Sequence, residues 1–142
     1  MKAYALVSVQ VIAIGLILVS GGPFARDLPL LVMEIAGIML GIWAVVIMGW
    51  HNLNISPLVK RDARLVTKGP YAFIRHPMYS ALLLTFWPLI VDRYSLFRLA
   101  AGLILTVDLL IKIRYEERLL KKHFAAYESY MRVTKRLIPF VL

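Results

Sequence analysis

Two short stretches of this chain hold residues that could do chemistry. The first, residues 65–79, contains two prolines, a glycine, two tyrosines, an arginine and a histidine. Its glycine-proline pair, Gly69-Pro70, predicts a turn, and Pro77 suits the first turn of a helix. Such a helix presents His76 and Tyr79 on one face, and its free N–H groups could meet an anion. Arginine, histidine and tyrosine are also common interfacial anchors at a membrane boundary.

The second stretch is the pair Glu116 and Glu117, which follows an apolar run and opposes a local excess of basic residues. One glutamate could accept hydrogen bonds from a polar ligand, such as ribose hydroxyls or an amino group. Alternatively, Glu117 forms a modest surface ion pair with Lys121, one helical turn later. If both stretches lie at the same membrane face, they could close one polar pocket.

The composition indicates that lipid surrounds the elements that position these residues. Of the 142 residues, 61% are hydrophobic, and the mean hydropathy is +0.75. Soluble domains have roughly 45–50% apolar residues. Four apolar runs predict membrane spans at about 3–20, 28–50, 78–91 and 95–113, and residues 114–132 predict a C-terminal amphipathic helix in the cytoplasm. We expect an all-α integral membrane bundle of about four transmembrane helices, with residues 1–142 as a single domain.

The basic charge predicts the orientation of this bundle. The formal net charge is +9. Residues 51–77 contain five basic residues and one acidic residue, and residues 112–142 contain eight basic residues and three acidic ones. By the positive-inside rule, loop 51–77, the tail and the N-terminus face the cytoplasm, across the inner or plasma membrane of a bacterium or archaeon. Because the basic segments alternate with apolar spans, we expect no nucleic-acid partner. The chain has no cysteine, so thiolate metal sites are excluded, and we expect no metal.

Further polar residues approach the same face from the predicted spans. Asp108 lies inside the fourth span, two turns before the glutamate pair, and could line a substrate site there. His51 and Asn54 leave the second span at this face and could border that site. Gly37 and Gly41 form a small-xxx-small step, which suits close helix packing or a homodimer.

With these motifs, the second half of the chain resembles a membrane methyltransferase family that includes isoprenylcysteine carboxyl methyltransferases and phospholipid (phosphatidylethanolamine) N-methyltransferases. The resemblance covers about residues 50–140 and rests on four segments: 63–71, Arg75-His76-Pro77-Met78-Tyr79, Glu116-Glu117-Arg118-Leu119-Leu120, and Tyr127 and Tyr130 ahead of 134–139. An Arg-His-Pro-x-Tyr motif alone is a weak signal. A helical hairpin and then Glu-Glu at the right distance make it specific.

The resemblance implies a site for S-adenosylmethionine at the cytoplasmic face, within a cofactor loop at residues 63–79. The cofactor-binding residues that it implies are Lys68, Gly69, Pro70, Tyr71, His76, Tyr79, Glu116 and Glu117. Arg75 and the two glutamates are the candidate catalytic residues, and Arg114 could bind a carboxylate of the cofactor or substrate. The substrate would be a lipid or lipidated molecule that enters sideways from the bilayer.

The methyl acceptor stays open at this point. A carboxylate is already ionised at pH 7, whereas an amine would need deprotonation by a glutamate or by His76. We expect an isoprenylcysteine-like carboxylate first and a phospholipid amine second. Membrane sterol and enone reductases that use NADPH share a related C-terminal region, but they are much longer. The non-enzymatic alternative is a membrane protein whose basic tail binds anionic lipid.

Overall fold

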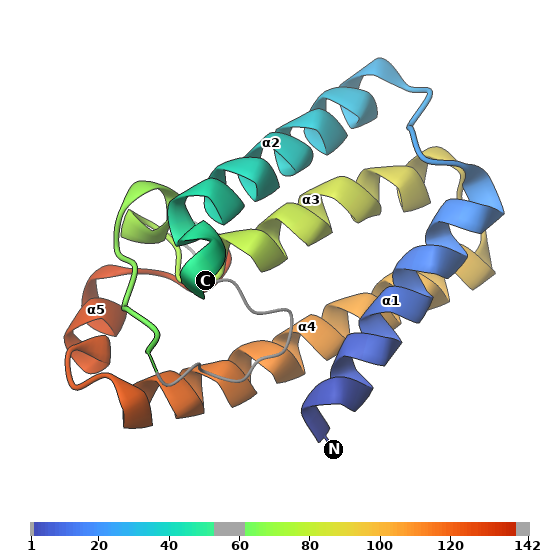
Figure 1. Ribbon diagram of the computed structural model, residues 1–142. Helices are drawn as coiled ribbons and strands as arrows, with labels where there is room; N and C mark the ends of the chain where they lie inside the picture. The colour runs from blue at the N-terminus through green and yellow to red at the C-terminus, as the bar shows by residue number, and fades with distance from the viewer. Residues whose placement is uncertain (1, 53–61, 139–142) are drawn as a thin grey trace.

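The computed structural model describes residues 2–52 and 62–138, and this part of the chain is helical with no β-strand (Figure 1). The helices are α1 (Lys2–Gly21), α2 (Leu28–Asn52), the 3-10 helix η1 (Gly69–Ala72), α3 (Pro77–Asp92), α4 (Leu96–His123) and α5 (Tyr127–Val133). The all-α prediction is confirmed. The first three apolar runs form helices within one or two residues of their predicted bounds.

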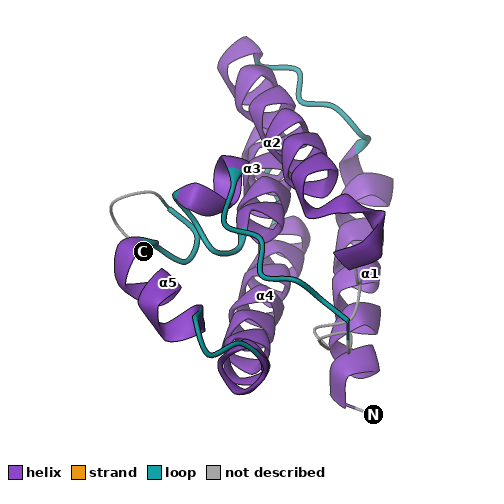
Figure 2. Ribbon diagram, turned by 60° about the vertical axis from the view of Figure 1, so that its left-hand side comes forward, coloured by secondary structure: helices purple, strands orange, loops and turns teal. Residues whose placement is uncertain are grey.

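The four long helices form two pairs. The closest contacts join α2 to α3 and α1 to α4, and the pairs diverge along much of their length (Figures 1 and 2). The buried apolar cluster lies where α1, α3 and α4 meet, and its members are Ala13, Ile17, Ala25, Phe86, Leu89, Ile90, Ala101, Leu105 and Leu109. The other end of the molecule, where α5 and η1 lie, is held by polar contacts.

Gly37 and Gly41 bring α2 against α3. A Cβ atom added at Gly37 would lie 2.7 Å from the backbone nitrogen of Thr85, and one at Gly41 would lie 3.3 Å from the Ala81 Cβ. The small-xxx-small step therefore packs two helices of the same chain, and a homodimer stays a proposal without support from these glycines.

We expect Gly37→Leu to separate α2 from α3 and to destabilise the fold by about 1–3 kcal/mol, because backbone atoms cannot move aside for the new side chain. Gly15→Ala is the matched control, since no atom lies within 4 Å of a Cβ at Gly15. Thermal unfolding of the two purified variants in detergent gives the comparison. Equal midpoints for both variants would contradict the close approach at Gly37.

In the part of the chain that the structure describes, two helices are long and apolar enough to cross a membrane, through Tyr4–Gly21 and Leu28–Trp50. Only 11% and 17% of these windows are buried inside the protein, so most of their apolar surface faces outward, as lipid contact requires. α3 is apolar but has only 16 residues, and α4 has Arg98, Asp108 and Lys112 within its apolar part. The four-span topology therefore stays a proposal.

The predicted separate helix at 114–132 is wrong. α4 continues without a break from Leu96 to His123, and only the seven residues Tyr127–Val133 form α5. No glycine or proline lies between residues 103 and 138, so the change from apolar to charged side chains near residue 113 does not interrupt the backbone. The helix ends where Phe124 becomes extended (φ −118°, ψ 113°). Glu116 and Glu117 thus lie on a rigid helix rather than at a hinge.

Candidate functional site

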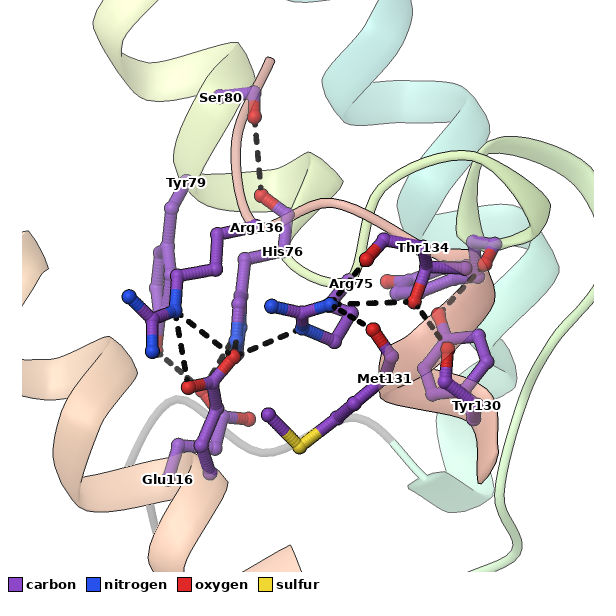
Figure 3. Close-up of polar contacts among 11 residues, drawn as sticks. Arg75, His76, Tyr79, Ser80, Glu116, Tyr130, Met131, Thr134 and Arg136 are labelled. Carbon is purple, nitrogen blue, oxygen red and sulfur yellow. Dashed lines mark hydrogen bonds and ion pairs between the residues drawn. The ribbon is translucent and has the colours of Figure 1, made fainter. Parts of the chain in front are cut away.

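Three segments build a polar cluster at the α5 end of the molecule (Figure 3). The start of α3 contributes His76 and Tyr79, and α4 contributes Glu116 and Glu117. Residues 134–138, here called the C-terminal strap, run beside residues 74–76 and add Arg136. The two stretches predicted to share a pocket therefore do come together.

Glu117 is the buried centre of this cluster. Its carboxylate accepts a hydrogen bond from Arg75 Nε at 2.9 Å and one from Arg136 Nε at 3.2 Å, and His76 Nε2 lies 3.6 Å away. Burial alone would raise the pKa of Glu117, but the contacts with His76, Arg75 and Arg136 outweigh it and lower the pKa to about 2. Glu117 is therefore a fixed negative charge.

Arg75 joins Glu117 to the C-terminal strap. Its side chain is 7% exposed, and Nη1 donates to the Thr134 carbonyl and, at 3.1 Å, to the Met131 carbonyl. The Arg75 backbone N–H also donates to the Lys135 carbonyl at 2.7 Å. Arg75 was predicted as catalytic, and these contacts make it a buried structural link that leaves little of its side chain free for a ligand.

Glu116 has different surroundings from its neighbour. Its Oε2 accepts a hydrogen bond from the Tyr79 hydroxyl at 3.0 Å and lies 3.6 Å from His76 Nδ1. The His76 and Tyr79 rings stack with centroids 5.5 Å apart. The Glu116 side chain is 29% exposed, whereas His76 is buried and its Nε2 faces the enclosed Glu117 carboxylate. Through Glu116, this side of the cluster is open to a ligand.

A cleft of about 640 Å³ opens onto Tyr79 and Glu116. It lies between α1, α2 and α3, and its walls are apolar along α2 and α3, from Gly37 to Val46 and from Met78 to Phe86. A second cavity, of about 710 Å³, is almost wholly apolar. It is lined by other side chains of α2 and α3, by residues of the 70–74 segment, and by Leu137 and Ile138 of the C-terminal strap. Of these two cavities, the first reaches Tyr79 and Glu116.

A smaller polar cavity of about 200 Å³ lies against the other side of Glu117. Its wall holds four basic side chains with Met131: Arg114, Arg118, Lys121 and Arg136. Arg114, predicted to bind a carboxylate, is exposed on this wall. Lys121 shares the cavity with Glu117, but the ion pairs of Glu117 are with arginines and His76, not with Lys121.

The predicted cofactor loop packs against α2 and α5. Gly69 has a positive φ of 59°, and an added Cβ there would lie 2.9 Å from Ile47 Cγ1, so both conformation and space favour glycine. Tyr71 is buried, and its carbonyl accepts a hydrogen bond from the Tyr130 hydroxyl at 2.6 Å. Pro70 is buried beside it, while Lys68 is exposed.

The predicted substrate residues are less fully placed. Asp108 is 3% exposed, and neither of its carboxylate oxygens has a hydrogen-bond partner in the part of the chain that the structure describes. His51 lies in the last turn of α2, and Asn54 lies outside the described residues. No group of three or more potential metal-ligating histidines or carboxylates occurs among the described residues.

Sequence reasoning missed two contacts that shape the site. Arg136 reaches Glu117 from the C-terminal strap, and Lys112 Nζ donates a hydrogen bond to Gln10 Oε1. Arg136 stood inside a matched motif, so its charge could have been paired with Glu117. Nothing in the sequence connects Gln10 with Lys112, since 102 residues separate them.

Comparison with known proteins adds a family and two relatives. A sequence model of the phospholipid methyltransferase family matches residues 27–127. The methanethiol S-methyltransferase of Crocosphaera subtropica is 34% identical over 78 residues, which are 53% of this chain and 29% of that protein. The nickel-cobalt-cadmium resistance protein NccN of Alcaligenes xylosoxydans xylosoxydans is 36% identical over 92 residues, which are 63% of this chain and 42% of that protein. The chain thus spans less than half the length of either relative, and no solved structure matches it.

Proposed function

This chain belongs to the phospholipid methyltransferase family, and we propose that it transfers a methyl group from S-adenosylmethionine to a lipidic or amphiphilic acceptor at the cytoplasmic face of the membrane. The observation that carries the proposal is the meeting of Tyr79 and Glu116, with the buried His76 beside them, at one end of a cleft whose walls along α2 and α3 are apolar. Such a cleft suits a molecule with one polar and one apolar end.

The residues at this end fit S-adenosylmethionine. The Glu116 carboxylate can accept hydrogen bonds from ribose hydroxyls or an ammonium group, and its negative charge suits a sulfonium. When bound, the cofactor supplies a methyl group that a nucleophile can attack in line.

The protein's part in such a transfer is alignment and exclusion of water. Contacts among Glu117, Arg75 and the C-terminal strap hold the start of α3 against α4, so we assign these residues positioning roles. Tyr79 fixes the Glu116 carboxylate through its hydroxyl. A carboxylate acceptor, as in isoprenylcysteine carboxyl methyltransferases, needs no base, which fits a site where Glu117 is ionised and enclosed.

The second candidate is N-methylation of a phospholipid or other amine. It is favoured by the Glu116 carboxylate at the wall of the cleft, where it could take a proton from an ammonium group. The methanethiol S-methyltransferase relative adds a thiol as a third kind of nucleophile. In each case the acceptor would enter from the bilayer.

Calorimetric titration of the detergent-purified protein with S-adenosylhomocysteine and with NADPH tests the proposal. We expect binding of the adenosyl ligand and none of NADPH. A folded protein that binds no S-adenosylhomocysteine would contradict the enzymatic proposal and favour a lipid-binding membrane protein.

A further inference from the structure

α1 reaches the site through Gln10. The family match begins at residue 27, so α1 lies wholly outside it. Yet Gln10 lines the same cleft as Tyr79 and Glu116, and among the described residues it is the α1 side chain that does so. A polar side chain in the middle of an apolar helix is unfavourable unless it has a partner or a function.

The partner of Gln10 fixes the direction of its amide. Lys112 of α4 is 1% exposed, and its Nζ donates a hydrogen bond to Gln10 Oε1. An ammonium group can only donate, so the amide oxygen must face Lys112. The amide nitrogen of Gln10 then points elsewhere, and it has no hydrogen-bond partner among the described residues. Its two N–H groups are available to a molecule in the cleft.

The two sides of Tyr79 have opposite polarity. Its hydroxyl donates to Glu116, while Lys112 Nζ lies 6.0 Å from the centroid of its ring. The cleft therefore presents the Glu116 carboxylate at one place and the Gln10 amide at another, with the buried Lys112 ammonium behind the amide. Asp108, one turn before Lys112 in α4, partly balances the ammonium charge. A cationic methyl donor matches the Glu116 side, and a nucleophile with a negatively charged oxygen matches the Gln10 side.

We propose that Gln10 is a specificity-determining residue, whose amide N–H groups bind the carboxylate of an amphiphilic acceptor in the cleft that α1, α2 and α3 line. The inference rests on the proposed methyltransferase function and adds to it a role for α1, which the family match does not cover. Lys112 is the positioning residue that orients the amide.

The test compares Gln10→Leu, Gln10→Glu and Ser8→Ala with the wild-type protein. Gln10→Glu keeps an oxygen for Lys112 but has no amide N–H, and Ser8 is an exposed α1 residue bonded within its own helix. The probes are N-acetyl-S-farnesylcysteine, dodecylamine and dioleoylphosphatidylethanolamine. For each protein, methyl transfer to each probe and the Kd of S-adenosylhomocysteine are measured.

We expect the wild-type protein to prefer the farnesylcysteine carboxylate. Both Gln10 variants should raise its KM on the order of 10-fold, the usual effect of losing a hydrogen bond to a charged group, with the Kd of S-adenosylhomocysteine unchanged. Ser8→Ala should leave both values unchanged. A wild-type KM in Gln10→Leu, an equal rise in the Kd of S-adenosylhomocysteine, or a wild-type preference for either other probe would overturn the inference. So would adenosyl binding without transfer to any probe. Absence of adenosyl binding by the wild-type protein would instead overturn the proposed function.

Discussion

Glu117→Ala is expected to lower the free energy of unfolding by about 3–5 kcal/mol, the usual effect of removing one partner of a buried ion pair. The side chains of Glu117 and Arg75 are only 6% and 7% exposed, and the Arg75 guanidinium would stay buried without its counter-charge. Arg136 would lose its partner at the same time. Titration of the protein with SDS in mixed micelles measures the change.

The C-terminal strap provides an independent readout of the same substitution. Because Arg75 and Arg136 hold the strap to the site, the variant should be cleaved faster by trypsin after Lys135 and Arg136. Glu128→Ala is the matched control, since Glu128 is exposed on α5, and it should change stability by less than about 0.5 kcal/mol. If both variants unfold at the same SDS concentration, Glu117 is not the centre of the polar cluster.

The helices themselves could be predicted because the sequence marks their ends. Gly-Gly-Pro follows the first apolar run, and Pro77 begins the third. Ser95 is the N-cap residue of α4, and its hydroxyl accepts a hydrogen bond from the Arg98 N–H at 3.2 Å. Serine is a favoured N-cap residue. The far end of α4 has no such marker. There the change from apolar to charged side chains was taken for an end, although charged side chains favour helix as much as apolar ones.

The convergence of the two chemical stretches was predictable from topology, but the way they are joined was not. The topology predicted from the sequence placed the start of α3 and the glutamate pair at one membrane face, where they could meet. The strap, in contrast, depends on a parallel pairing of Ile74 with Lys135 and on side-chain contacts across 59 residues, between Arg75 and Thr134. Such distant pairings leave no periodic pattern in a sequence, so only the three-dimensional structure brings Arg136 and Gln10 to the site.

We propose that, of the two adjacent glutamates, Glu117 positions the site and Glu116 binds the ligand. Neighbouring residues on an α-helix point about 100° apart, since a turn takes 3.6 residues. Glu117 consequently faces the strap and is enclosed by Arg75, His76 and Arg136, while Glu116 faces the cleft with its side chain 29% exposed. Loss of the first should unfold the site, whereas loss of the second should leave the fold intact and remove a contact to the ligand. That difference separates a functional glutamate from a structural one by experiment.

Glu116→Gln is therefore expected to raise the Kd of S-adenosylhomocysteine about 10–100-fold, the range for a lost hydrogen bond to a charged group. The glutamine keeps an oxygen for the Tyr79 hydroxyl, so the unfolding free energy should stay within about 1 kcal/mol of the wild-type value. Calorimetric titration gives the Kd, and Glu128→Gln, which removes an exposed carboxylate from α5, is the control for net charge. An unchanged Kd in Glu116→Gln would place the adenosyl ligand away from the cleft and leave the basic cavity beside Arg114 as the alternative site. A loss of affinity in the Glu128 variant as well would mean that the ligand responds to overall charge rather than to the Glu116 carboxylate.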